Sequence, residues 1–237
     1  MRVSAVERDL FDLGEVTAKR LDQWRTVLLQ LPTSSTLGLG SGITTFLNRE
    51  LRGAAIVAAM AEVENLVRTS LLAVSTEINT SSTQLKDLKQ ALRALAVHSS
   101  FMSLSNTRDT DKTWDQRHFV STLDTNPEIA SLPGATTVSA PPPLDGRTIR
   151  PSHILRIWAV LGLGGSPFPA PRCSTSLTKL ALLRNDIAHR NIPISEVFQQ
   201  PGTSATQIAQ YLDDIQLLVL HVASEIASYC SLQSYKT

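Results

Sequence analysis

The stretch Leu-Leu-Arg-Asn-Asp-Ile-Ala-His-Arg, residues 182–190, is the most informative part of the sequence for both the fold and the candidate site. It lies in a segment that is expected to be helical from about residue 174 and to end before Pro193. At about 100° per residue, the apolar side chains of this segment fall on one face: Leu177, Leu180, Leu183 and Ile187. Asn185 and His189 fall about opposite to that face, beside Leu182. We therefore expect one face of the helix to pack in a core and the other to lie at an interface between subunits.

The polar residues of this stretch are able to act on a phosphodiester without a metal ion. Arg184 supplies a cation for the phosphate, and His189 supplies an imidazole for proton transfer. Asn185 precedes His189 by one turn, so its amide can orient the imidazole. An ordinary helix surface is the alternative, with His189 favoured near the C-terminus by the helix dipole. The residue types alone leave both interpretations open.

The rest of the sequence predicts an all-α protein. The chain has 237 residues, and its low aromatic content of 5% implies a core of Leu, Ile, Val and Ala, which suits helices. Apolar residues recur at helical spacing in five further segments: residues 1–31, 43–78, 84–99, 148–161 and 204–231. We expect an N-terminal helix and linker over 1–42 and a helical domain over 43–237. Residues 100–150 are polar and carry several prolines, so an irregular insertion is expected there.

Composition excludes several classes of protein. The formal net charge of +1 argues against a basic protein that coats nucleic acid, so any RNA contact must come from a local patch. Two cysteines cannot build a disulfide framework or a cysteine-rich zinc site, and no apolar run approaches the length of a membrane span. The glycines at 38, 40 and 42 lack the lysine and the preceding strand of a phosphate-binding loop. We therefore expect a cytoplasmic protein with no membrane contact, no metal and no cofactor.

The segment 184–189 also resembles a known motif. Arg-Asn-Asp-Ile-Ala-His fits the Arg-Asn-x-x-x-His form, an Arg-x4-His motif, of the HEPN superfamily (higher eukaryotes and prokaryotes nucleotide-binding). Upstream, the alanine-rich segment 58–67 with Glu64 looks like the N-terminal helix of the RiboL-PSP-like and MAE-type bacterial members. From the residues alone, Glu64 either pairs with Arg68 on the surface or faces the segment 184–189. The resemblance covers roughly residues 45–230.

The resemblance implies a HEPN-like helical bundle that forms a homodimer and cleaves RNA without a metal, as a toxin or in anti-phage defence. Arg184 would then hold the scissile phosphate, His189 would transfer protons and Asn185 would orient them. Glu64, Asp186 and Arg190 are expected to support the site. The partners implied are RNA, a second copy of the chain, and an antitoxin or defence-system protein. A non-catalytic HEPN adaptor or subunit of a larger defence complex is the alternative.

Two positions depart from the family pattern. Arg190 stands where many members have glycine, and it either adds a phosphate contact or changes the end of the helix. Asn191 stands where members that are paired with a nucleotidyltransferase antitoxin often have tyrosine. Control by modification of that tyrosine is therefore not expected in this chain.

Overall fold

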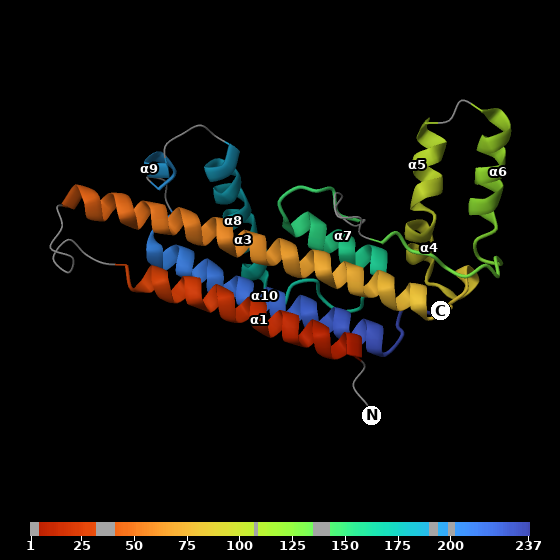
Figure 1. The fold of residues 1–237 in the computed structure, drawn as a ribbon, viewed down its shortest axis with the longest axis horizontal. Helices are drawn as coiled ribbons and strands as arrows, with labels where there is room; N and C mark the ends of the chain where they lie inside the picture. The colour runs from red at the N-terminus through yellow and green to blue at the C-terminus, as the bar shows by residue number, and fades with distance from the viewer. Residues whose placement is uncertain (1–4, 32–40, 107–108, 135–142, 190–193, 199–201) are drawn as a thin grey trace.

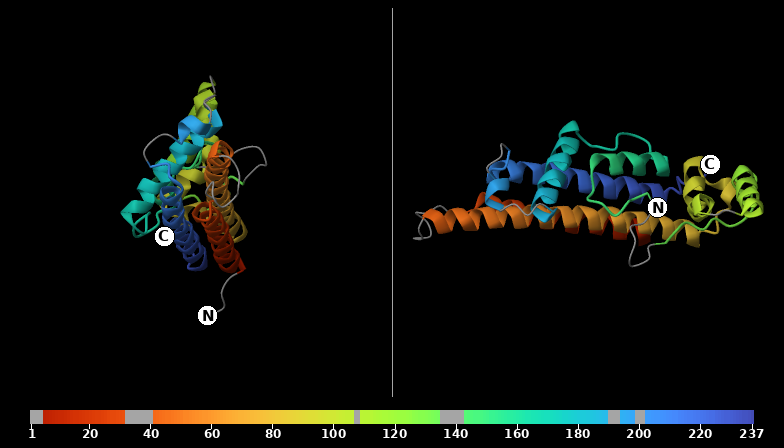
Figure 2. Two further views of the ribbon diagram at one scale, coloured as in Figure 1. Left: turned by 90° about the vertical axis from the view of Figure 1, so that its left-hand side faces the viewer. Right: turned by 90° about the horizontal axis from the view of Figure 1, so that it is seen from above.

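Three long helices form the main layer of the molecule. The computed structural model describes residues 5–31, 41–106, 109–134, 143–189, 194–198 and 202–237. Helices α1 (Ala5–Leu29), α3 (Ser41–Thr80) and α10 (Ala205–Ser231) run along the length of the molecule (Figures 1 and 2). Helix α10 packs against α1, α3 and α8 (Pro171–His189). The all-α architecture expected from the sequence is confirmed in the described residues, which contain only two isolated β-bridges and no strand.

Shorter helices pack on this layer. Helix α7 (Pro151–Leu161) contacts α4 (Gln90–Ala96) and α8, and the small α9 (Ile194–Val197) contacts α3 and α8. Helix α4 leads to a hairpin of α5 (His98–Asn106) and α6 (Thr110–Ser121), which projects away from the long helices at one end of the molecule (Figure 1). None of the described helices is both long enough and apolar enough to cross a membrane.

The core is aliphatic, as the composition predicts. Leu, Ile, Val and Ala make up most of the buried side chains, and both cysteines, Cys173 and Cys230, are buried and free. Helix α1 contributes Leu10, Leu21 and Leu28 to this core. The expected boundary at residue 42 therefore separates two helices that share one hydrophobic core.

Two segments differ from the sequence-based expectation. Residues 84–99 do not form one helix, because a 3₁₀ turn at Leu85–Asp87 precedes α4, and α5 begins at His98. The backbone N–H of Leu85 donates to the carbonyl of Glu128, and the backbone N–H of Lys89 donates to the carbonyl of Tyr235. These two N–H groups are therefore bonded to other segments and do not take part in a continuous helix.

The insertion that was expected to be irregular over 100–150 is helical in part, because α5 and α6 lie in this region. Asp109 begins α6 as an N-cap, since its Oδ1 accepts hydrogen bonds from the backbone N–H groups of Asp111 and Lys112 at 3.1 and 3.2 Å. None of the side chains of α6 is buried. This helix therefore depends on its cap and its turn-to-turn contacts more than on an apolar face.

Gly14 is a point of close approach between α1 and α10. A Cβ atom at this position would lie 2.7 Å from the Cβ of Ala223. We expect Gly14→Ala to lower the free energy of unfolding by about 1–3 kcal/mol, because the two backbones must separate to admit the methyl group. Urea denaturation followed by circular dichroism measures this change. Gly164→Ala is the control, since no heavy atom lies within 4 Å of its added Cβ; equal stability of the two variants would contradict the close packing.

Candidate functional site

Helix α8 has the two faces that its sequence predicts. Leu177, Leu180 and Leu183 are buried, while Leu182 on the opposite side is 51% exposed. The helix is fixed against α10 by Asp214, which is buried and accepts hydrogen bonds from Arg172 Nε at 2.7 Å and Ser176 Oγ at 2.6 Å. Two charge-assisted hydrogen bonds to one buried carboxylate hold α8 in a defined position along the core.

Arg184 and Asn185 of α8 meet Glu64 of α3 at one cavity. Its volume is about 430 Å³, and its lining comes from three parts of the chain. Helix α3 contributes Glu64, helix α8 contributes Arg184 and Asn185, and the segment before α7 contributes residues 146–148 and Arg150. The sequence left two arrangements open for Glu64, and in the structure Glu64 faces the segment 184–189.

Glu64 is a carboxylate in a partly desolvated position. Burial raises its pKa, and the Arg184 cation and a hydrogen bond from the Ile149 backbone N–H act in the opposite direction without cancelling that rise. Its Oε1 atom is buried and has no hydrogen-bond partner among the described residues. A buried acceptor left in this state costs stability.

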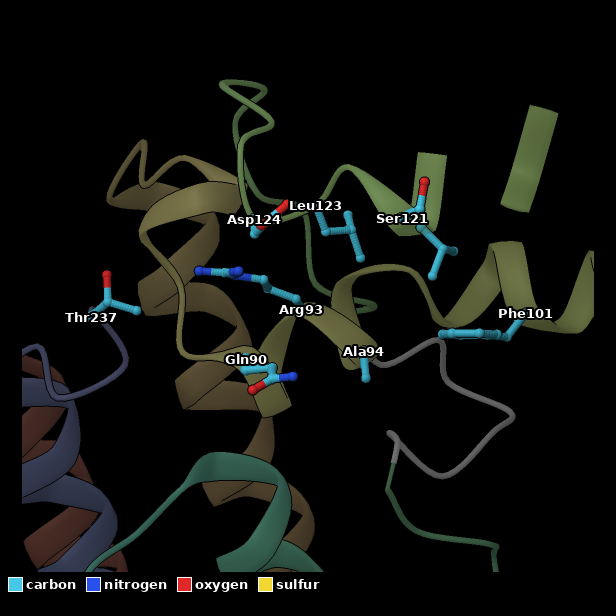
Figure 3. A pocket seen from close by; sticks show the side chains of 9 residues that line it. Gln90, Arg93, Ala94, Phe101, Ser121, Leu123, Asp124 and Thr237 are labelled. Atoms are coloured by element: carbon cyan, nitrogen blue, oxygen red, sulfur yellow. The ribbon is translucent and has the colours of Figure 1, made fainter. Parts of the chain in front are cut away.

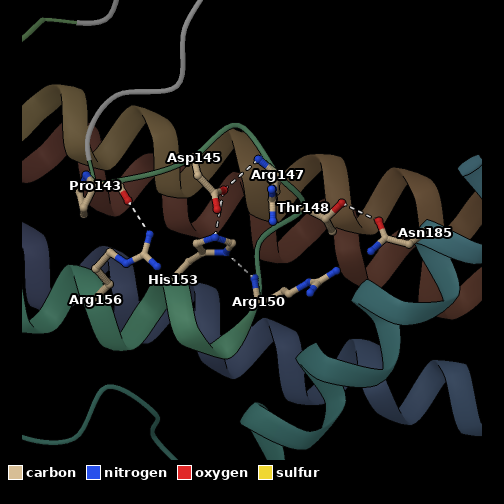
Figure 4. A network of polar contacts seen from close by, with 8 residues as sticks. All are labelled: Pro143, Asp145, Arg147, Thr148, Arg150, His153, Arg156 and Asn185. Atoms are coloured by element: carbon tan, nitrogen blue, oxygen red, sulfur yellow. Dashed lines mark hydrogen bonds and ion pairs between the residues drawn. The ribbon is translucent and has the colours of Figure 1, made fainter. Parts of the chain in front are cut away.

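Asn185 is joined to the segment before α7. Its Oδ1 accepts a hydrogen bond of 2.9 Å from Oγ1 of Thr148, which is itself buried (Figure 4). The sequence suggested that Asn185 orients His189, and the structure gives its amide oxygen this different partner. The amide therefore ties the polar face of α8 to the lining of the cavity.

A buried histidine lies behind this lining. His153 is 4% exposed, its Nδ1 accepts a hydrogen bond of 3.0 Å from the Arg150 backbone N–H, and its Nε2 lies 3.1 Å from Oδ1 of Asp145 (Figure 4). Because Nδ1 accepts, the ring proton is on Nε2 and is donated to the carboxylate. The pKa of Asp145 is lowered, chiefly by the hydrogen bond from the Arg147 backbone N–H and further by His153 and the Arg147 charge.

The other expected site residues are not among the described residues that line the cavity. Helix α8 ends at His189, whose side chain lies outside the described residues, as does the whole of Arg190. Asp186 is partly exposed and is not among the residues that line the cavity. The structure thus brings together Glu64, Arg184 and Asn185.

Sequence reasoning missed the contribution of residues 145–153. Arg147, Thr148 and Arg150 line the cavity, although they lie within the region 100–150 that was expected to be irregular. A signal was present in the run Asp-Gly-Arg-Thr-Ile-Arg-Pro at 145–151, where two arginines follow a turn glycine just before a helix. Gly146 has a φ of +75°, which identifies that turn.

A second cavity, of about 620 Å³, lies between α4, α5 and α6 (Figure 3). Its lining is mixed and includes Phe101, Leu123 and Arg93. The guanidinium group of Arg93 donates to the carbonyls of Leu88 at 2.9 Å and Lys86 at 2.7 Å, so it caps the local backbone. This cavity does not gather residues that are suited to catalysis.

A scan against models of protein families, a search of curated proteins and a search of solved structures each returned no match.

Proposed function

We propose that this protein is a metal-independent endoribonuclease of the HEPN superfamily, which acts as a toxin or an anti-phage effector in the cytoplasm. The observation that carries the proposal is the cavity in which Glu64 of α3 meets Arg184 and Asn185 of α8. The HEPN resemblance rests on these residues together with His189, which completes the Arg-x4-His motif. A cationic cavity beside a polar helix end suits a phosphodiester, and the ribose 2′-hydroxyl provides a nucleophile that DNA lacks.

In the proposed reaction, the 2′-oxygen attacks the phosphorus and the 5′-oxygen leaves. The products are a 2′,3′-cyclic phosphate and a 5′-hydroxyl end, and the proton of the 2′-hydroxyl is balanced by one given to the leaving oxygen. Arg184 stabilises the charge on the phosphate, and His189 transfers a proton. A homodimer supplies two copies of the motif, and the exposed Leu182 on the outer face of α8 is suited to such an interface.

Replacement of His189 tests the proposal. We expect His189→Ala to lower RNA cleavage by about 10²–10⁴-fold, because proton transfer is lost. Purified wild type and variant are incubated with total RNA in EDTA, and the product ends are analysed for cyclic phosphate. His118→Ala, which removes an exposed histidine of α6, is the control. Equal cleavage by wild type and His189→Ala would refute the mechanism.

A non-catalytic HEPN adaptor is the second candidate. The bond between Asn185 and Thr148 favours it, because it gives the motif amide a structural role. The low net charge is also in keeping with a subunit that binds protein. This candidate predicts no cleavage of any RNA by wild type and a stable complex with an antitoxin or a defence-system protein.

A further inference from the structure

The segment before α7 adds positive charge to the cavity. Arg147 and Arg150 are both exposed at their side chains and both line the cavity that contains Arg184. The side chain of Arg150 extends toward α8 (Figure 4). Three arginines and one carboxylate, that of Glu64, therefore line this single cavity. Such an excess of guanidinium groups is suited to the oxygens of phosphate groups.

Hydrogen bonds fix this segment from both ends. Asp145 Oδ1 accepts from the Arg147 backbone N–H at 3.1 Å, and the same carboxylate accepts from the buried His153 ring. The other ring nitrogen of His153 accepts from the backbone N–H of Arg150. One imidazole thereby connects the start of the segment to its end, and the Thr148–Asn185 bond connects its middle to α8. The backbone that carries the two arginines is held in place before any ligand arrives.

We propose that Arg147 and Arg150 bind a phosphate of single-stranded RNA next to the scissile phosphate that Arg184 holds, and that Asp145 and His153 are positioning residues for this subsite. The proposal rests on the proposed ribonuclease function for the identity of its ligand. It goes beyond the motif on α8, because it assigns RNA binding to a segment that lies before α7. Contacts to the backbone carry no base information, so the subsite adds affinity without sequence preference.

The binding test uses the His189→Ala protein, so that RNA is not consumed. Fluorescence anisotropy with a labelled single-stranded oligouridylate measures affinity over a range of salt concentrations. We expect Arg147→Gln and Arg150→Gln each to weaken binding about tenfold, as for the loss of a charge-assisted hydrogen bond. Each is also expected to reduce the salt slope by about 0.7. Lys179→Gln, an equal change of charge at an exposed position of α8, is expected to leave binding unchanged.

Two variants of Asp145 test its role as a positioning residue. Asp145→Ala removes the acceptor that serves Arg147 and His153, so we expect its affinity for the oligouridylate to fall about as far as that of Arg147→Gln. Asp145→Asn keeps an oxygen acceptor and is expected to retain most of the affinity. Equal thermal stability of the two variants would separate positioning from folding. Binding by Asp145→Ala as tight as that of its parent would overturn the positioning role.

Parallel assays separate this inference from the proposed activity. Arg150-dependent binding with no cleavage by wild type would refute the ribonuclease and leave the subsite in place. Cleavage by wild type with undiminished binding by both arginine variants would refute the subsite and leave the activity. Failure of every protein to bind the oligouridylate would overturn the subsite.

Discussion

Replacement of Arg184 by glutamine is expected to lower the rate constant of RNA cleavage by about 10²–10³-fold, the usual effect of removing one group that stabilises transition-state charge. Glutamine keeps a polar side chain of comparable reach but carries no charge. The substrate phosphate then lacks the cation that the cavity places beside Glu64. Single-turnover cleavage of a labelled RNA measures the change. Lys179→Gln on the same helix is the matched control, and it is expected to cleave at the wild-type rate.

Stability must be followed in the same experiment. The Arg184 cation lowers the pKa of Glu64 and so favours its charged form in the partly desolvated cavity. Arg184→Gln removes this attraction, and we expect the protein to be less stable at neutral pH as a result. The double variant Glu64→Gln, Arg184→Gln removes the carboxylate as well and is expected to regain stability. Recovery of cleavage along with stability would show that Arg184 acts through folding alone, against the proposed role.

Most of the helices could be predicted from the helical periodicity of the apolar residues. The apolar spacing of α10 and of the core face of α8 predicted which of their side chains are buried, because amphipathic helices with long runs leave few alternatives. The segment 84–99 has similar spacing, yet it breaks at Leu88. Its backbone instead engages Glu128 and Tyr235, which lie far away in the sequence. Local periodicity carries no information about such distant competitors.

Some residues of the candidate site could likewise be predicted from the sequence, and others could not. Arg184 and Asn185 are adjacent in the sequence on one helix, so their closeness in space followed from the sequence, although consecutive helical residues point about 100° apart. Glu64 needed the additional knowledge of which helices are neighbours, and the family resemblance supplied that expectation. Arg147 and Arg150 approach the cavity because Asp145 and the buried His153 fold the chain around a turn at Gly146. That arrangement depends on tertiary hydrogen bonds, which spacing along the chain does not reveal.

Glu64→Gln is expected to stabilise the protein at neutral pH while it lowers cleavage. Because burial raises the folded-state pKa of Glu64 above its unfolded value of about 4.5, the carboxyl group stabilises the protein fully only below that unfolded value. That stabilisation is lost as the pH rises through the folded pKa. Glutamine resembles the protonated form at every pH. The melting temperature of Glu64→Gln should therefore exceed that of wild type at pH 7, and the difference should shrink as the solution is acidified.

Cleavage by the same variant is expected to fall about a hundredfold, because Arg184 loses the attraction of the neighbouring carboxylate that helps to position it. Glu62→Gln on the same helix is the control, since Glu62 pairs with the exposed Arg20 at 3.1 Å and does not line the cavity. It is expected to change stability by no more than about 1 kcal/mol and to leave cleavage unchanged. If Glu64 served only the fold, its neutralisation would not raise the stability of the protein. A gain in melting temperature together with a loss of cleavage would therefore identify Glu64 as a residue of the functional site. A melting temperature of Glu64→Gln below that of wild type at pH 7 would contradict this assignment.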